Sequence, residues 1–229
     1  MKFLLSNDDG IDAPGLAALF AAAQTLGKPV VVAPHGPQSG VSHAVTYDGV
    51  LRVQERGPDR YAVHGSPADC TRAGLHRLAP DARWILSGIN QGGNLGADVY
   101  YSGTVAAVRE AVLHGWPGIA LSQYHKRGVA LDWDRAAQWA VRVITDILPR
   151  PVETGLFYNV NFPHLTSDEP EPAIVFCPLD PNPLPLSFRH EENGDWYYNG
   201  DYHARAHRDG TDVDVCFKGN IAVTAIRLF

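Results

Sequence analysis

Short apolar runs alternate with longer helical patterns through most of the chain, and this alternation limits the possible folds more than any other feature. The apolar runs, several of them rich in β-branched residues, cover residues 2–6, 29–34, 84–88, 118–122 and 156–162. The helical patterns cover residues 14–27, 66–78, 102–115 and 132–148. Strands that alternate with helices of this length indicate βαβ units. The sequence therefore predicts an α/β fold with a parallel, doubly wound sheet.

Residues 41–64 break this rhythm between the second strand and the second helix. Turn signals at Asp48-Gly49 and Gly57-Pro58-Asp59 separate short β-like runs in this stretch. We expect a β-hairpin or meander that is inserted beside the sheet. With this insertion, the catalytic core would extend over residues 1–163.

The last part of the chain, residues 164–229, has a different character. Seven prolines fall between positions 163 and 185, which excludes a continuous helix or a central strand there. Residues 188–214 are polar and aromatic, with turn signals at Asn193-Gly194 and Asn199-Gly200. We expect an extended arm whose aromatic side chains pack on a partner subunit. A closing strand at 222–229 would return the chain to the core.

Composition and charge exclude several classes of protein. The net charge of −6 argues against a general nucleic-acid binder, because phosphate contacts need a basic surface. No stretch approaches the length of a membrane span. The three cysteines, Cys70, Cys177 and Cys216, are odd in number and far apart, which is typical of reduced thiols. We therefore expect a cytoplasmic protein that does not bind nucleic acid or membranes.

Polar clusters follow three of the predicted strands and begin one of the predicted helices. They are residues 7–10 after the first strand, 34–40 after the second, 88–94 after the strand at 84–88, and Ser102-Gly103-Thr104. The carboxyl ends of parallel strands share one edge of a sheet, and ligands bind at that edge. We therefore expect these four clusters to meet.

The residue types in these clusters favour phosphoryl chemistry. Asp8 and Asp9 supply anionic oxygens, and Ser39 and Asn90 supply neutral ones, a set that suits Mg²⁺, Mn²⁺ or Ca²⁺ better than zinc. The turn at 102–104 offers hydroxyls and backbone N–H groups at a helix N-terminus, where anions bind. A metal beside an anion site would polarise a phosphoryl group.

Each cluster also has a purely structural interpretation. Asp8-Asp9-Gly10 taken alone is more often a turn with an Asx cap than a metal site. Ser102 or Thr104 could serve only as a helix cap. The glycines of residues 88–96 could serve tight turns, and His43 could make only a structural hydrogen bond. The coincidence of four clusters at one sheet edge favours the functional interpretation over these alternatives.

Several motifs in this order resemble the SurE family, the stationary-phase survival proteins that are metal-dependent 5′-nucleotidases. The motifs are LLSNDDGIDAPG, VVAPHGPQSGVSHAVT, HGSPADC, SGINQGGNLGADVYYSGTVAAVREA and NVNFP, followed by a weaker match at 210–226. The resemblance implies a Rossmann-like, three-layer α/β/α domain with a hairpin arm that helps to form dimers or tetramers. We accordingly expect a homodimer or homotetramer held through residues 178–203.

The resemblance also implies roles for individual residues. It implies one divalent metal ion per subunit with four ligands, Asp8, Asp9, Ser39 and Asn90. It implies phosphate-side groups at Asn94, Ser102, Gly103 and Thr104. The expected reaction is hydrolysis of nucleoside 5′-monophosphates, in which Asp8 or Asp9 either activates water or attacks the phosphorus directly.

Other functions remain open at this level. A haloacid-dehalogenase-type phosphatase would need the motif D-x-D-x-T after the first strand, whereas the two aspartates of this chain are adjacent and Ile11 follows Gly10. A phospho-accepting receiver domain would be shorter and would need an aspartate after the strand at 84–87. A nonenzymatic nucleotide-binding or phosphate-binding protein of the same fold is a further alternative, as is a phosphatase of broader specificity, of the acid-phosphatase or exopolyphosphatase type.

Overall fold

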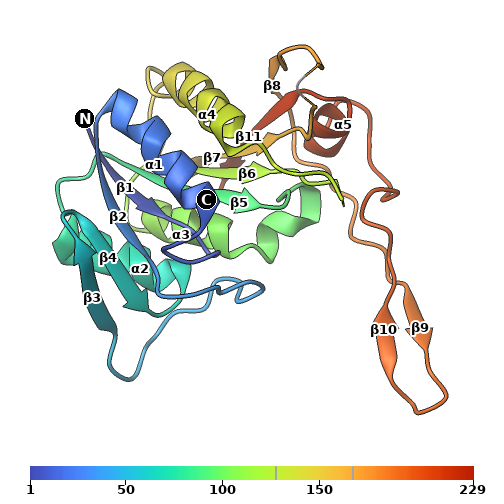
Figure 1. The fold of residues 1–229 in the computed structure, drawn as a ribbon, viewed down its shortest axis with the longest axis horizontal. Coiled ribbons are helices and arrows are strands. Elements are labelled where there is room, and N and C mark those ends of the chain that lie inside the picture. Colours follow the sequence, from blue (N-terminus) through green and yellow to red (C-terminus); the bar gives the residue numbers. More distant parts are fainter. Residues whose placement is uncertain (127, 167) are drawn as a thin grey trace.

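The computed structural model describes residues 1–126, 128–166 and 168–229. One nine-stranded sheet forms the centre of the molecule, in the order β3-β4-β2-β1-β5-β6-β7-β11-β8 (Figure 1). Its strands are β1 Lys2–Ser6, β2 Lys28–Pro34, β3 Arg52–Gly57, β4 Arg60–His64, β5 Trp84–Gln91, β6 Gly118–Gln123, β7 Leu156–Phe162, β8 Ile174–Phe176 and β11 Ile221–Arg227. The helices are α1 Pro14–Leu26, α2 Pro67–Ala73, α3 Gly103–Leu113, α4 Trp133–Ile147 and α5 Asp212–Phe217, with the short turns η1 Gly74–Leu78 and η2 Gly96–Tyr100.

The middle of the sheet is parallel, as the sequence predicts. Strands β4, β2, β1, β5, β6 and β7 pair in parallel with their neighbours. Strand β3 is antiparallel to β4 at one edge, and β11 is antiparallel to β7 near the other. This confirms the expected α/β fold with a largely parallel sheet.

Helices cover both faces of the sheet. Helices α1 and α4 pack on one face, where Leu19, Val143 and Ile144 join the apolar side chains of the strands. Helices α2 and α3 pack on the other face around Leu4, Ile85 and Val108. The strands between these layers are buried along almost their whole length, which explains their continuous apolar runs. None of the helices in the described residues is long and apolar enough to cross a membrane.

The region between β2 and α2 forms a hairpin only in its second half. Strands β3 and β4 pair over Arg52–His64, while residues 41–51 have no strand. The hairpin does not lie beside the sheet but extends it, because β4 pairs in parallel with β2.

The C-terminal region divides into an exposed hairpin and a buried return to the core. Strands β9 Phe188–His190 and β10 Trp196–Tyr198 form a separate two-stranded sheet that projects away from the body (Figure 1). Its turn lies at Asn193-Gly194, as the sequence predicts, whereas Asn199 closes the base of the hairpin by donating to the Ser187 carbonyl (3.0 Å). Residues 212–217, at the start of the weaker match at 210–226, form helix α5, and the expected closing strand is β11.

Candidate functional site

The predicted site lies at the topological switch point of the sheet, between two neighbouring strands whose following helices cover opposite faces. Strands β1 and β5 are adjacent and parallel, and the helices that follow them, α1 and α3, cover opposite faces. The loops after β1 and β5 therefore diverge and leave a crevice, which is the usual ligand position in such sheets. Asp8 and Asp9 follow β1, and Asn90 lies at the end of β5.

Asp8 is held against the first turn of α3. The Thr104 hydroxyl donates a hydrogen bond to Asp8 Oδ1, and Ser102 caps the helix by accepting from the Val105 N–H (3.1 Å). Gly103 permits this close approach, because a Cβ atom at that position would lie 2.8 Å from Asp8 Cβ. The order Ser-Gly-Thr thus supplies a cap, a space for the carboxylate and a donor to it.

Asp8 and Asp9 are neighbouring carboxylates whose charges affect each other. Within the described residues, no lysine, arginine or histidine forms an ion pair with Asp8 or Asp9. Burial, together with the neighbouring Asp9 charge, raises the pKa of Asp8 to about 6, although the Thr104 hydroxyl opposes this change. Burial also raises the pKa of Asp9, against a hydrogen bond from the Gln91 N–H (3.1 Å). A positive charge is what this pair lacks.

The other two predicted ligands lie in loops that contact these aspartates. The Gln38 N–H donates to the Asp8 carbonyl (2.7 Å), which brings the exposed Ser39 next to β1. Asn90 directs its Nδ2 to the Gly92 carbonyl (2.8 Å), and no donor among the described residues reaches its Oδ1. The donor set of two carboxylates, a hydroxyl and an amide oxygen fits a hard divalent cation.

Asn94, predicted as a phosphate-side residue, is buried in a polar network. Its Nδ2 donates to Ser122 Oγ (2.7 Å), and its backbone is bonded to the side chains of Asn159 and Asn161. These three partners come from β6 and β7, and sequence spacing alone could not bring them to Asn94. The motif NVNFP was the signal that could have identified them.

Two further contacts fix the loops around the site. The sequence allowed a structural hydrogen bond for His43 but did not identify its partner, and the contact of Ser42 had no signal. His43 Nε2 lies 2.9 Å from Glu110 Oε2 on α3, and Ser42 Oγ donates to the Tyr100 carbonyl (3.1 Å). The hydrogen bond with His43 holds the pKa of Glu110 below its usual range, against the effect of its burial. The segment after Ser39 is thereby attached to the helix that begins with residues 102–104.

Arg205 supports the loop between β5 and α3 from the C-terminal region. Its Nη1 donates to Asp98 Oδ2 (3.0 Å) and its Nη2 to the Leu95 carbonyl (3.1 Å). Tyr202 donates to the same Asp98 oxygen (2.6 Å), and Asp212 accepts from the Gly96 N–H (2.8 Å). The sequence offered no signal for these contacts, because residues 188–214 looked like one exposed arm.

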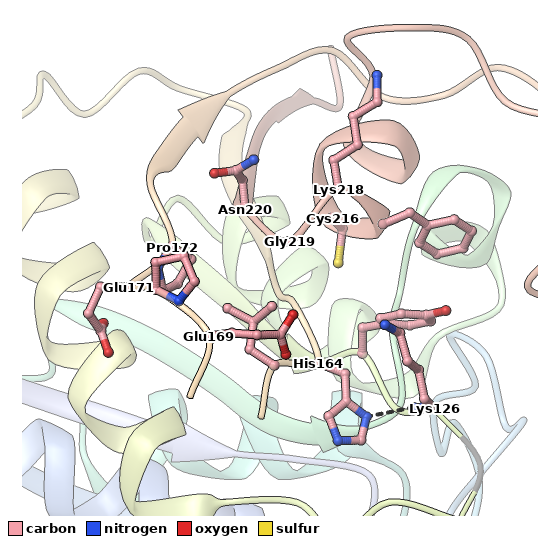
Figure 2. A pocket seen from close by; sticks show the side chains of 13 residues that line it. Lys126, His164, Glu169, Glu171, Pro172, Cys216, Lys218, Gly219 and Asn220 are labelled. Atoms are coloured by element: carbon pink, nitrogen blue, oxygen red, sulfur yellow. Dashed lines mark hydrogen bonds between the residues drawn. The ribbon is translucent and has the colours of Figure 1, made fainter. Parts of the chain in front are cut away.

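Several cavities surround the sheet edge. One of about 200 Å³ includes Asp9 and is also lined by Gln91 and Trp133. Figure 2 shows another, of about 300 Å³, beyond the carboxyl ends of β6 and β7, where the Lys126 N–H donates to His164 Nδ1 (2.7 Å). That second cavity contains none of the predicted site residues, so the crevice at Asp8 and Asp9 stays the candidate site.

The fold and site define a doubly wound α/β protein with paired acidic residues at the N-terminus of a helix. Comparison with protein-family models matches residues 3–180 to the family described as Survival protein SurE. The chain therefore belongs to the SurE family.

Individual relatives agree with this assignment over the full chain. The chain is 48% identical, over all of both sequences, to a protein of Nostoc sp. named as a candidate 5′-nucleotidase. It is 40% identical to the 5′-nucleotidase SurE of Roseobacter denitrificans, covering 99% of this chain and 94% of the relative. The crystal structure of the SurE protein from Aquifex aeolicus matches with a TM-score of 0.85 and 31% identity, covering 100% of this chain and 94% of that one.

Proposed function

We propose that this chain is a metal-dependent 5′-nucleotidase that hydrolyses nucleoside 5′-monophosphates to nucleoside and phosphate. The observation that supports this most directly is the pair Asp8 and Asp9, which forms no ion pair with a basic side chain among the described residues and lies against the N-terminus of α3. An acidic pair with no compensating charge fits a divalent cation, and a helix N-terminus fits a phosphate. The names of the relatives supply the nucleotide as substrate class.

Asp8, Asp9, Ser39 and Asn90 would hold one Mg²⁺ or Mn²⁺ ion, and Ca²⁺ could occupy the same ligands. When bound, the ion polarises the phosphoryl group and offsets its negative charge. Within the chain, Thr104 orients the Asp8 carboxylate through its hydroxyl. The N–H groups and hydroxyls at residues 102–104, together with Asn94, would hold the phosphate oxygens.

Asp8 or Asp9 would either deprotonate a water or attack the phosphorus directly. The steric course at phosphorus distinguishes these two routes. With a substrate whose phosphoryl group is made chiral by oxygen isotopes, direct attack by water inverts the configuration, whereas formation and hydrolysis of a covalent aspartyl intermediate are two successive displacements that retain it.

A phosphatase assay across nucleoside monophosphates tests the proposal. We expect activity with Mg²⁺ or Mn²⁺ that a chelator removes, and a loss of at least about a hundredfold in Asp8→Asn. Asp12→Asn is the matched control, because Asp12 follows on the same loop but is exposed and paired with Arg60 (3.0 Å). A wild-type protein without activity on any nucleotide, or full activity in Asp8→Asn, would contradict the proposal.

We also propose that the protein forms a homodimer or homotetramer through its hairpin. The side chains of Phe188, Trp196, Tyr197 and Tyr198 are exposed on β9 and β10. Such an apolar surface is more stable against a partner chain than in water. Light scattering of a variant that lacks residues 188–198 tests this, since an unchanged oligomeric mass would contradict it. A cytoplasmic location agrees with the three unpaired thiols of the chain.

A further inference from the structure

The loop that connects β5 to α3 carries predicted site residues at both ends. Asn90 lies at its start and Ser102 at its end, so the course of the loop sets the distance between the metal side and the phosphate side. Three glycines, Gly92, Gly93 and Gly96, lie in the first half of this loop. Glycine leaves the backbone many accessible conformations, so a fixed course requires contacts from outside the loop.

Asn161 on β7 contacts both backbone groups of Asn94, near the middle of that first half. Its Oδ1 accepts from the Asn94 N–H (2.8 Å), and its Nδ2 donates to the Asn94 carbonyl (3.0 Å). A carboxamide that pairs with N–H and C=O of one residue fixes both the position and the orientation of that residue. Among the described residues, Asn161 is the one side chain that by itself engages both backbone polar groups of a residue in this loop.

Asn159 adds a second donor to the same carbonyl. Its Nδ2 lies 2.8 Å from the Asn94 carbonyl oxygen, and its Oδ1 is buried without a partner among the described residues. Asn159 and Asn161 are two residues apart on one strand, so both side chains lie on the same face of the sheet. Ser122, in register with Asn161 on β6, accepts from the Asn94 side chain (2.7 Å).

Burial shows that these asparagines are unusual strand residues. Both are almost completely buried, between neighbours such as Phe157, Val160 and Phe162 that form the core. A buried carboxamide costs free energy unless it is hydrogen-bonded, and strands prefer β-branched or aromatic residues at such positions. Packing of β7 therefore does not explain them, whereas their contacts with the Asn94 backbone do.

We propose that Asn161, assisted by Asn159, is a positioning residue of the active site. It holds the loop from β5 at Asn94, so that Asn90 on the metal side and the turn at 102–104 on the phosphate side keep a fixed separation. Neither asparagine needs to touch the substrate for this role. The kinetic part of the proposal depends on the function proposed above, whereas the structural part does not.

Two alanine variants and one control test the proposal. Asn161→Ala removes both bonds to the Asn94 backbone, while Asn159→Ala removes one donor and leaves Asn161 in place. The matched control is Trp116→Phe, which removes one hydrogen bond to a backbone carbonyl (3.1 Å) at the opposite edge of the sheet. Thermal unfolding of all three proteins shows how much stability each change removes.

Kinetics with a nucleoside monophosphate and inhibition by inorganic phosphate give the first measurement. We expect kcat/KM to fall by about a hundredfold in Asn161→Ala and by less in Asn159→Ala, because a small misplacement of binding groups has effects of this size. We also expect KM and the Ki of phosphate to rise on the order of tenfold. Partial unfolding would lower kcat and leave KM and Ki unchanged, which is the pattern expected of Trp116→Phe if it loses stability.

Hydrogen exchange gives the second measurement and does not require activity. In Asn161→Ala, the amides of residues 92–102 should exchange faster, while those of α1 keep their wild-type rates. If Asn161→Ala does not fold, Asn159→Ala carries both measurements. Unchanged exchange at 92–102, or an unchanged Ki of phosphate, would overturn the proposal. A wild-type protein without activity on nucleotides would contradict the proposed function instead, and exchange alone would then decide whether Asn161 holds the loop.

Discussion

Arg205 and Arg189 belong to the same C-terminal region and have the same kinds of partner, but their surroundings are opposite. Arg205 lies 3.0 Å from Asp98 Oδ2 and over the ring of Tyr202 at 5.0 Å. Arg189, on β9, lies 3.0 Å from Glu191 Oε1 and over the ring of Tyr197 at 5.5 Å. The Arg205 side chain is 0% exposed, whereas that of Arg189 is 64% exposed.

This difference separates the hairpin tip, residues 188–198, from the hairpin root, residues 180 and 201–212. An exposed ion pair is screened by water and contributes little to stability. A buried pair loses its hydration, so removing one partner leaves an uncompensated charge in the interior. The root therefore belongs to the folded core and supports the loop beside the candidate site, while the tip is free to contact another molecule.

The largest expected difference in stability is that between the removal of Arg205 and the removal of Arg189. Arg205→Met should lower the free energy of unfolding by about 3–5 kcal/mol, because Asp98 would remain buried without its cation. Arg189→Met should change it by less than about 0.5 kcal/mol. Urea denaturation of both variants checks this. Equal losses would show that tip and root are not distinct. Combining Arg205→Met with Asp98→Leu should recover part of the loss, since it removes both charges.

Two glycines with positive φ provide the next comparison. Gly96 has φ +54°, and a Cβ atom there would lie 2.9 Å from Arg205 Nη2. Gly194, in the turn of the hairpin, has φ +90° and no atom within 4 Å of such a Cβ. Gly96→Ala should therefore cost about 2–4 kcal/mol from backbone strain and overlap. Gly194→Ala should cost less than about 1 kcal/mol in global stability, because the tip can unfold locally. Denaturation midpoints distinguish these outcomes.

These root contacts also show where prediction from sequence ends. The alternation of apolar runs and helical patterns predicted the parallel sheet, because that pattern is local and repeats along the chain. Arg205 and Asp98 are 107 residues apart, and nothing in their neighbourhoods indicates a pair. Arg205 lies in a polar, aromatic stretch that looks identical in character to the exposed hairpin. A side chain that is buried by distant segments gives no periodic signal.

The hydroxyls of Tyr202 in the root and Tyr197 in the tip should differ by an intermediate amount in their contribution to stability. Tyr202→Phe removes the hydrogen bond to the Asp98 carboxylate (2.6 Å) and keeps the ring, so a loss of about 1.5–3 kcal/mol is expected. Tyr197→Phe removes an exposed hydroxyl on the tip and should have almost no effect. Thermal or urea unfolding measures both. A loss in Tyr197→Phe as large as that in Tyr202→Phe would contradict the division into tip and root.

The root should also respond to pH through Asp180. Burial favours the neutral carboxyl, but N–H groups of Arg208 and Asn182 and the Thr211 hydroxyl outweigh it and hold the pKa of Asp180 below its usual value. A depressed pKa contributes stability above the ordinary aspartate value of about 3.9, and this is lost as the pH falls below it. Unfolding free energies measured from about pH 5 to pH 3 should fall less steeply in Asp180→Asn than in the wild type. Equal slopes would contradict this assignment.

In the candidate site, too, some residues could be predicted from the sequence around them, whereas others could be found only from the fold. Asp8, Asp9, Asn90 and the turn at 102–104 follow strands or begin a helix, so a rule about sheet edges predicted that they meet. Asn159 and Asn161 escaped that rule because they lie within β7 and reach the site only through the Asn94 backbone. Residues that act directly at a sheet edge carry a local signal, whereas those that hold a loop in place are visible only in the fold.

Removal of the hairpin tip changes the most residues of any variant here but should have the smallest effect on the free energy of unfolding. Ser187 and Asn199 are hydrogen-bonded across its base through Ser187 Oγ and Asn199 Oδ1 (2.6 Å), so Gly-Gly can replace residues 188–198. A deletion of residues 178–203 would be unsuitable, because it also removes Asp180 and Tyr202 from the root.

The shorter deletion should change the free energy of unfolding by less than about 0.5 kcal/mol at a protein concentration where wild type and variant are both monomeric. It should also leave the exchange of amides 92–102 at wild-type rates, because Arg205 and Tyr202 remain in place. A loss of more than about 2 kcal/mol would mean that the tip stabilises the core, and the contrast between Arg189 and Arg205 would then reflect exposure alone and not two separate roles.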